Sequence, residues 1–305
     1  MSRIVCLGHA ALDRFYRIEA FPPEPTKVRA IEHIESGGGM AANAAAAIAR
    51  LGAKAELWSR VGDDEAGTKV KAGLKAGKVD VRHVQAFEEG RTSTSAIIVD
   101  DRGERLIVGN RDTNMPSSTS WLPLERLGDT DAVLADVRWL EGARVLFTRA
   151  RAERVPTVLD ADLGAREALG ELLELTDYAV FSEGALKDFA PKISHEAAFA
   201  KVAALGCRHV GVTLGANGYV WADGDGLHTA PAFAVDVVDT TGAGDAFHGA
   251  FTLGVAQGLP MAEIVKRASA TAALACGRLG SRAGLPNLKQ LEAFLAAEAA
   301  KVPAA

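Results

Sequence analysis

Residues 239–245, which read Asp-Thr-Thr-Gly-Ala-Gly-Asp, form the segment of this chain whose residue types and spacing best suit chemistry. A Gly-Ala-Gly turn that leads into a helix directs several backbone N–H groups toward one point, at the positive end of the helix dipole. Asp245 stands beside that point in the first helical turn. The pair favours phosphoryl transfer, because the turn binds the phosphoryl group while the carboxylate accepts the proton of the attacking hydroxyl. A capped helix after a tight turn is the structural alternative.

Three other segments offer binding groups. Consecutive glycines at 37–39 open a second helical pattern, where a ligand can approach the backbone closely or the chain can hinge. Asp13 follows the first predicted strand, where a carboxylate can bind hydroxyl groups or cap a helix. Residues 213–218 (Thr-Leu-Gly-Ala-Asn-Gly) follow another strand and suit either a phosphate-binding turn or a plain hairpin turn.

Alternating strand-like and helix-like segments must position these residues. Apolar runs predict strands, and the 3.6-residue periodicity of small and apolar residues predicts helices. The predicted strands are Arg3–Leu7, Ala55–Val61, Ala132–Asp136, Thr157–Asp160, Tyr178–Phe181 and His209–Thr213. The predicted helices are Met40–Leu51, Asp64–Ala76, Trp139–Arg154, His195–Leu205, Gly244–Gly258, Met261–Gly277 and Leu288–Ala300. This alternation indicates a mostly parallel sheet with helices on both faces.

Two segments depart from the alternation and predict a separate small sheet. Residues 15–36 are too long for an ordinary loop and contain strand-like pieces at 27–34. Elsewhere in the chain, an apolar strand-like run precedes Asp239. Residues 92–108 read as a hairpin that turns at 101–103. A small exposed sheet has unpaired edges that a second copy can cover, so we expect a homodimer through these segments.

The string at 239–247, Asp-Thr-Thr-Gly-Ala-Gly-Asp-Ala-Phe, resembles the C-terminal signature of the ribokinase-like (PfkB) carbohydrate kinases. Residues 38–45, with the order Gly-Gly-x-x-Ala-Asn-x-Ala, resemble the N-terminal signature of the same family. The resemblance implies one ATP-dependent sugar kinase domain over 1–305. Its expected fold is a three-layer αβα sandwich with a mostly parallel sheet and a small β-sheet lid formed by 15–36 and 92–108.

The resemblance also implies roles for single residues. Asp245 would be the catalytic base, with Gly242, Ala243 and Gly244 as the anion hole. The residues implied to contact the sugar are Asp13, Gly38, Gly39 and Asn43. Those implied to contact the nucleotide are Ser182, Thr213, Gly215, Gly218 and Ala272. ATP and Mg²⁺ are the implied cofactors, and Asp239 and Thr241 match the family's monovalent-cation site, with K⁺ as the candidate ion.

One departure concerns magnesium. The family usually carries Asn-x-x-Glu after a central strand, whereas residues 182–185 read Ser-Glu-Gly-Ala. Glu183, or Asp160 or Asp162, would then have to reach the magnesium through water.

Within the family, residues 135–139, 181–183 and 282–286 resemble the bacterial sulfofructose kinases. That likeness implies that Lys27 and Arg138 bind the sulfonate of 6-deoxy-6-sulfofructose, and Asn110 stands next to the expected amide position at Gly109. Arg138 follows a strand, at the sheet edge where α/β proteins bind ligands, and Lys27 lies in the expected lid. The forked guanidinium of Arg138 and the ammonium of Lys27 can together bind an anionic group of the sugar. Both can instead be solvated surface charges. The alternatives are a fructokinase, ketohexokinase or ribokinase type of enzyme acting on a neutral or acidic sugar, a nucleoside kinase, and a non-catalytic sugar sensor.

Composition excludes several other classes. The 305 residues carry a net charge of -5, which disfavours binding to nucleic acids or anionic membranes by bulk electrostatics. The opening residues read as a strand rather than a signal peptide, and no apolar run approaches the length of a membrane span. The three cysteines are far apart in sequence, as expected for buried thiols in a reducing cytoplasm.

Overall fold

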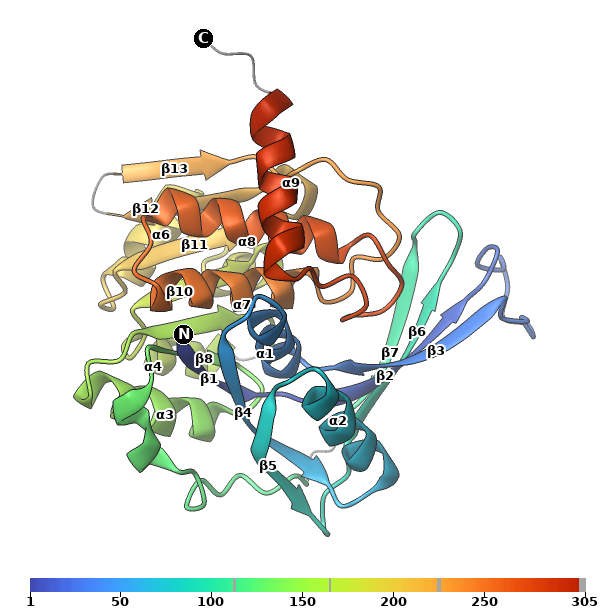
Figure 1. Ribbon diagram of the computed structural model, residues 1–305, viewed down its shortest axis with the longest axis horizontal. Coiled ribbons are helices and arrows are strands. Elements are labelled where there is room, and N and C mark those ends of the chain that lie inside the picture. The colour runs from blue at the N-terminus through green and yellow to red at the C-terminus, as the bar shows by residue number, and fades with distance from the viewer. Residues whose placement is uncertain (112–113, 165, 224–225, 302–305) are drawn as a thin grey trace.

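The computed structural model describes residues 1–111, 114–164, 166–223 and 226–301. Within them the strands form one large and one small sheet (Figure 1). The large sheet has the spatial order β13 (Gly226–Ala230), β12 (Tyr219–Asp223), β11 (His209–Thr213), β10 (Tyr178–Ser182), β9 (Thr157–Ala161), β8 (Ala132–Asp136), β1 (Arg3–Gly8), β4 (Lys54–Gly62) and β5 (Asp80–Phe87). The small sheet has the order β3 (Glu32–Gly38), β2 (Ala11–Arg17), β6 (Ser93–Val99) and β7 (Arg105–Asn110).

Helices cover both faces of the large sheet, which confirms the three-layer arrangement. On one face lie α1 (Met40–Arg50), α2 (Glu65–Ala76), α7 (Ala243–Ala256) and α8 (Met261–Ala275), with α9 (Leu288–Lys301) packed beside α8. On the other lie α3 (Leu140–Ala152), α4 (Arg166–Leu173), α5 (Glu183–Phe189) and α6 (His195–Ala203). Two short 3₁₀ helices are η1 (Leu124–Asp129) and η2 (Gly215–Asn217).

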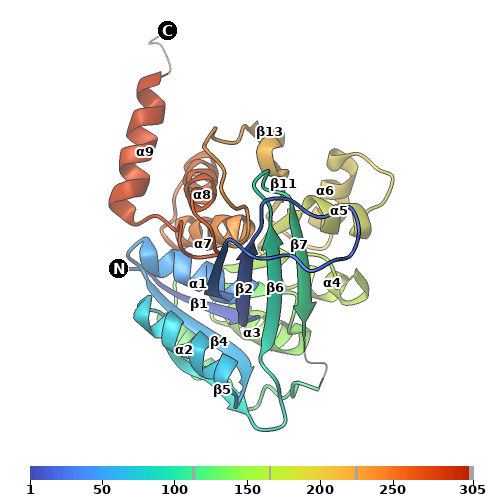
Figure 2. The ribbon, with the colours of Figure 1, turned by 90° about the vertical axis from the view of Figure 1, so that its right-hand side faces the viewer.

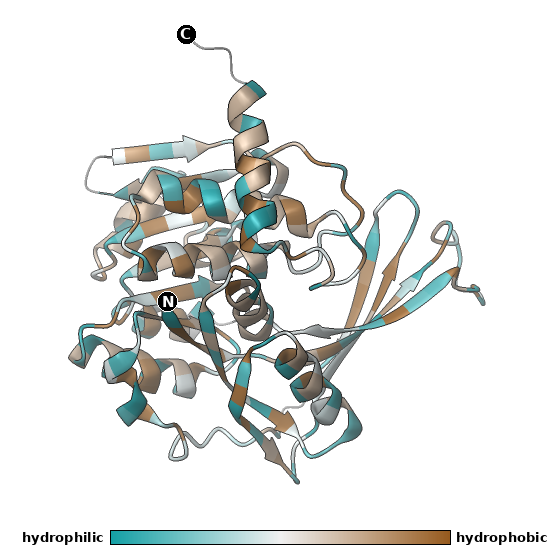
Figure 3. Cartoon of the chain, in the orientation of Figure 1, coloured by the Kyte–Doolittle hydropathy of each residue, from teal (hydrophilic) through white to brown (hydrophobic). Residues whose placement is uncertain are grey.

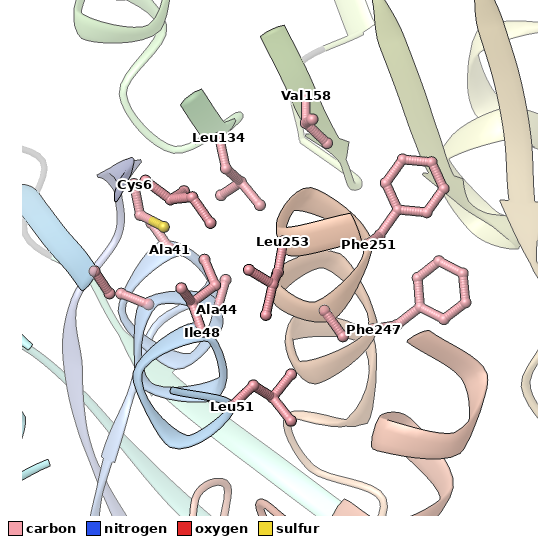
Figure 4. Close-up of a cluster of buried hydrophobic side chains, with 14 of the residues drawn as sticks. Cys6, Ala41, Ala44, Ile48, Leu51, Leu134, Val158, Phe247, Phe251 and Leu253 are labelled. Carbon is pink, nitrogen blue, oxygen red and sulfur yellow. The ribbon is translucent and has the colours of Figure 1, made fainter. Parts of the chain in front are cut away.

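The core between α1, α7 and the central strands decides where the two glycine-rich helix starts lie. Figure 4 shows Ala44 and Ile48 of α1 facing Leu253 of α7, below Leu134 and Val158 of the sheet. Alanine fills most of α1, so this helix can approach its neighbours closely. Both helices therefore begin side by side at the carboxyl edge of the sheet. Figure 3 shows the hydrophobic residues concentrated in these strands and helices.

The predicted parallel strands are confirmed, but the antiparallel edge was not predicted. Strands β1, β4, β5, β8, β9, β10 and β11 pair in parallel, whereas β12 and β13 pair antiparallel beyond β11. The sequence analysis also does not predict β5, α4 or α5. These elements are short or weakly periodic, and burial between neighbouring elements supplies what their own pattern lacks.

The small sheet is confirmed, with β2 antiparallel to β3 and parallel to β6, and β6 antiparallel to β7. Figure 2 looks onto this sheet, which continues from the carboxyl end of β1. The strand predicted at 27–34 was wrong in its bounds, since pairing with β2 starts at Glu32 and runs to Gly38. Pro22, Pro23 and Pro25 lack the N–H donors that a ladder needs, which favours a loop before β3.

The strand-like run before Asp239 was also wrong. Residues 231–240 form no strand. Pro231 cannot donate to a ladder, and Val238 is 48% exposed. The Val238 and Asp239 N–H groups both donate to the Cys276 carbonyl after α8, at 2.9 and 3.1 Å. The turn at 240–244 is therefore attached to the end of α8 rather than to a sheet.

Within the described ranges, no helix is both long and apolar enough to cross a membrane. The thiols of Cys6, Cys207 and Cys276 are free and buried, as expected.

Candidate functional site

The predicted anion-binding turn begins α7 at the carboxyl edge of the large sheet. Gly242 is the residue before the helix, and its φ of 79° is a left-handed conformation that favours glycine. A Cβ on Gly242 would stand 2.8 Å from the Ser281 carbonyl oxygen, so the turn packs tightly on the segment after α8. Ala243 donates its N–H to the Thr240 carbonyl at 3.2 Å. The next N–H groups, of Gly244 and Asp245, lie in the first turn, where a helix offers no acceptor.

Asp245 faces α1. Its Oδ2 accepts a hydrogen bond from Asn43 Nδ2 at 2.7 Å. Burial and the charge of Asp160 together raise the pKa of Asp245 from its ordinary value of 3.8 to about 7, against the opposing effect of the hydrogen bond from Asn43. A carboxyl with a pKa near neutrality is suited to accept a proton from a hydroxyl at physiological pH.

Asp13 lies on β2 across the site from Asp245. It is 6% exposed, and its Oδ2 accepts a hydrogen bond from the Ser281 hydroxyl at 3.1 Å. Burial raises the pKa of Asp13, and hydrogen bonds from Ser281 and Ser95 oppose that rise. A side chain at Gly38 would collide with the Asp13 carboxylate, so glycine lets β3 lie directly against it. Gly39, with φ of 92°, precedes α1. The structure thus brings the four predicted sugar contacts together.

Arg282 is a site residue that the sequence analysis did not assign. Its Nε donates to Asn43 Oδ1 at 2.7 Å and its Nη2 donates to the Gly38 carbonyl at 3.0 Å. Burial lowers the pKa of this guanidinium to about 10, while Asp13 and Asp245 raise it.

Two buried carboxyls lie under the helix starts: Asp136 was not predicted as a site residue, and Asp160 was considered only as a magnesium contact through water. Asp136, at the end of β8, accepts hydrogen bonds from the N–H groups of His9, Ala41 and Arg138 at 2.7, 3.0 and 2.8 Å. Asp160 pairs beside it in β9, and its Oδ1 lies 3.4 Å from His248 Nε2. Burial raises the pKa of Asp160 well above its ordinary value, and the charge of Asp136 adds to the rise. Both residues end buried parallel strands, which was the signal available in the sequence.

His248 supports the turn rather than facing a ligand, as expected for a packing residue. Its Nδ1 lies 2.7 Å from the Gly244 carbonyl and its Nε2 lies 3.3 Å from the Val180 carbonyl.

The proposed cation ligands lie just before the turn. Asp239 is 4% exposed and accepts hydrogen bonds from the N–H groups of Thr241 and Gly280, each at 2.9 Å. Thr241 Oγ1 is buried and has no hydrogen-bond partner among the described residues. A buried oxygen of this kind fits a monovalent cation. The described ranges contain no cluster of three or more His, Cys, Asp or Glu side chains that could hold a metal ion.

The predicted nucleotide residues share one side of the site. Ser182 and Thr213 pair directly across β10 and β11. Gly215 and Gly218, with φ of 57° and 90°, lie in the turn from β11 to β12, so the hairpin reading also holds. Ala272 lies half-buried on α8.

The groups considered for magnesium have protein partners. Ser182 Oγ donates to Asp162 Oδ1 at 2.9 Å, and Arg138 Nη2 donates to Asp162 Oδ2 at 3.2 Å. Glu183 is exposed and forms an ion pair with Lys187, which lowers its pKa. Asp160 is buried against His248, whereas the side chains of Glu183 and Asp162 are both accessible to solvent.

The predicted anion-binding residues lie on separate elements. Lys27 is exposed in the loop between β2 and β3, and Asn110 is exposed at the end of β7. Arg138 follows β8, where Asp162 and the Leu163 carbonyl hold its guanidinium.

Further cations approach the same sheet edge near His9, which follows β1. Burial lowers the pKa of His9, and the positive charges of Arg138, Arg111 and Arg60 also lower it. His9 Nε2 is buried without a hydrogen-bond partner among the described residues. Three guanidiniums therefore lie within electrostatic reach of His9, and Arg60 is held by a hydrogen bond to the Pro116 carbonyl at 2.6 Å.

The lid reaches the turn directly, because Arg105 of β7 donates a hydrogen bond to the Thr240 hydroxyl.

The chain is similar to several known sugar kinases. The chain is 30% identical to the ATP-dependent ribose-1-phosphate kinase of Halopiger xanaduensis, across 97% of this chain and 98% of that protein. It is 26% identical to the ribokinase of Lactococcus lactis, over 97% of each chain. Among solved structures, a putative ribokinase from Agrobacterium tumefaciens superposes with a TM-score of 0.93 and 34% identity, covering 98% of this chain and 99% of that one. Arabidopsis thaliana ribokinase, solved with ribose and ATP, gives a TM-score of 0.83 and 26% identity, over 96% and 98% of the chains. The sequence pattern of the pfkB family of carbohydrate kinases matches residues 1–288, so this chain belongs to that family.

Proposed function

We propose that this protein transfers the γ-phosphoryl group of ATP to a sugar hydroxyl, with Asp245 as the general base. The observation that carries the proposal is the buried Asp245 carboxyl at the start of α7, held by Asn43 and with a pKa of about 7. A base with a pKa near the working pH transfers protons efficiently.

The chain supplies the other groups that the reaction needs. The Gly244 and Asp245 N–H groups, at the positive end of α7, stabilise the charge of the transferred group. Asp13 and Asn43, with the backbone of Gly38 and Gly39, hold the sugar so that one hydroxyl faces Asp245. We treat residues 1–305 as one kinase domain, in which the lid segments 15–36 and 92–108 exclude water from the site.

The names of the relatives support ATP as the donor, since one is an ATP-dependent kinase and another was solved with ATP. Mg²⁺ bound with ATP would neutralise the charge of the phosphates. It usually keeps several waters and needs few protein ligands. Glu183 at the start of α5 would contact it through water, and Ser182 and Thr213 would line the phosphates.

We propose further that the sugar carries an anionic group. Arg138, Arg111 and Arg60 lie near enough to His9 for their charges to lower its pKa, and Lys27 is exposed on the loop between β2 and β3. Guanidinium groups bind sulfonate, phosphate or carboxylate oxygens through charge-assisted hydrogen bonds. The name of the Halopiger relative, a ribose-1-phosphate kinase, also refers to an anionic sugar. We take 6-deoxy-6-sulfofructose as the first candidate and ribose 1-phosphate as the second.

An ATP-consumption screen tests both parts of the proposal. The substrates are 6-deoxy-6-sulfofructose, ribose 1-phosphate, fructose, ribose and nucleosides, with Asp245→Asn as the inactive control. We expect the highest kcat/KM on one of the two anionic sugars. Ribose as the best substrate would indicate a neutral ribokinase type, and a nucleoside would indicate a nucleoside kinase. Sugar binding without ATP consumption would indicate a sensor.

The role of Arg138 is tested by comparing charged and neutral sugars. A charge-assisted contact contributes about 1.5–3 kcal/mol, which is about one to two decades in kcat/KM. Arg138→Ala should lose that much on the anionic sugar and far less on fructose or ribose. Arg144→Ala, on the exposed side of α3, is the matched control. Equal losses on charged and neutral sugars would assign Arg138 a structural role and refute the anion contact.

A further inference from the structure

The tripeptide Gly280-Ser281-Arg282, which follows α8, contacts Asp239 and Asp13 and reaches Asp245 through one intervening side chain. The Gly280 N–H donates to Asp239, the Ser281 hydroxyl donates to Asp13, and Arg282 reaches Asp245 through Asn43. The Ser281 carbonyl also packs on Gly242 of the turn. One short segment is thus linked to the proposed sugar contact Asp13, to the proposed cation ligand Asp239 and, through Asn43, to Asp245.

Arg282 determines which way the Asn43 amide points. An arginine only donates hydrogen bonds, so the Asn43 atom that it contacts at 2.7 Å must be the oxygen. The amide NH₂ group then faces Asp245 Oδ2, where it donates at 2.7 Å. A flipped amide would place its NH₂ group against the guanidinium and its oxygen against the carboxylate, which is unfavourable at both ends.

We propose that Arg282 is a positioning residue for phosphoryl transfer, which orients the Asn43 amide toward Asp245 and balances the negative charge of Asp13 and Asp245. The inference rests on the proposed function, in which Asp245 is the base. Arg282 acts through Asn43 and contacts no reacting atom.

The charges around Asp245 explain why this cation matters. Asp160 from β9 and Asp136 from β8 both raise the pKa of Asp245, while His248 from α7 lowers it. Asp13 from β2 adds a carboxylate near Arg282. Arg282, from the segment after α8, supplies positive charge to this acidic set, and its Nη2 is fixed by the Gly38 carbonyl. Its pKa of about 10 keeps it charged at neutral pH.

Arg282→Met tests the proposal, because methionine keeps an unbranched apolar stem in place of the arginine stem and removes the charge and the donors. We expect kcat to fall about ten- to hundredfold, as for loss of a charged hydrogen bond. We also expect the acidic limb of the kcat/KM profile to move to higher pH, since the Asp245 carboxylate loses a stabilising charge and an oriented donor. Arg282→Lys keeps the charge but not the fork, so it should restore most of the pH profile and part of kcat. Arg144→Met is the control for removing an arginine elsewhere.

A double-mutant cycle separates positioning from a general loss of structure. Arg282→Met should cost clearly less in an Asn43→Ala background than in wild type, because only the effect of the charge on Asp13 and Asp245 remains there. Additive losses, or an Arg282→Met enzyme that matches Arg144→Met in kcat and pH profile, would overturn the proposal. Thermal unfolding of each variant identifies any that fail to fold. If Arg282→Met fails to fold, the kcat and pH profile of Arg282→Lys still test the proposal. Wild-type turnover by Asp245→Asn would instead refute the proposed base.

Discussion

Replacing Asp245 by Asn should remove catalysis and stabilise the fold at the same time. The amide oxygen of the new side chain can still accept the hydrogen bond from Asn43, so the local geometry is retained. It cannot accept the proton of the substrate hydroxyl. General-base catalysis contributes about 10²–10⁴-fold, so kcat should fall by that factor while nucleotide binding changes little.

The gain in stability follows from the raised pKa of Asp245. The carboxyl ionises near 3.8 when exposed and near 7 in the folded protein. Each tenfold change in an ionisation constant corresponds to about 1.4 kcal/mol, so holding this charge in the fold costs on the order of 4 kcal/mol above pH 7. Below pH 3.8 the group is neutral in both states and the cost is absent. The free energy of unfolding therefore falls as the pH rises from 3.8 to about 7, because the unfolded chain releases this proton before the folded protein does.

The assay is denaturant unfolding of wild type and Asp245→Asn between pH 5 and pH 8, together with turnover at each pH. We expect the variant to be more stable than wild type already at pH 5, because the exposed carboxyl ionises from 3.8, and the difference to grow by about 2–3 kcal/mol up to pH 8. Wild-type kcat/KM should rise with pH through about 7, because only the ionised carboxylate accepts a proton. A stability difference that does not change with pH would refute the claim that burial sets the pKa of Asp245. Wild-type turnover in the variant would refute its role as base.

Three further outcomes are expected. Light scattering at micromolar concentration should show a homodimer, because β7 exposes Leu106, Ile107 and Val108, and Val108→Asp should give a monomer; a fully active wild-type monomer would contradict this. Replacing K⁺ by tetramethylammonium should slow wild type but not Thr241→Val, which lacks the unpartnered hydroxyl; equal rates of wild type in both salts would exclude the cation site. The three thiols should react with a disulfide reagent only after unfolding, since burial raises the pKa of each, that of Cys207 to about 12; fast reaction of the folded protein would disprove their burial.

The sequence predicted those parts of the site whose residues lie close together along the chain. Residues 239–245 and 36–44 combine glycines with a carboxylate or an amide at fixed spacing, and the structure brings Asn43 and Asp245 into contact. The central strands were predicted because buried parallel strands are short, continuous apolar runs. Asp13 was predicted from its place after the first strand, and that place is the start of β2.

The remaining features depend on contacts between distant segments. Nothing near Arg282 in the sequence indicates that its guanidinium reaches Asn43, 239 residues earlier. Asp136 looks like an ordinary strand end in the sequence, and its role becomes visible only when the start of α1 is placed over it. The loop at 18–31 was predicted in part as strand, because apolar residues after Lys27 carry the pattern while the ladder with β2 begins only at Glu32. In each case the contact with a distant segment determines the structure of the residue, and the local sequence pattern does not.

The contact between Asn43 and Asp245 shows how packing remote from the chemistry sets its geometry. Gly249 lies one turn after Asp245 on α7, and a Cβ there would stand 2.5 Å from the Ala44 carbonyl of α1. The two backbones therefore touch one turn below the site, and this contact fixes the separation of the helix starts above it. Asn43 has a short side chain, so it reaches Asp245 only because the helices approach this closely. The alanines and glycines of α1 and α7, which carry no functional group, thus place the amide beside the carboxyl that we propose as the base.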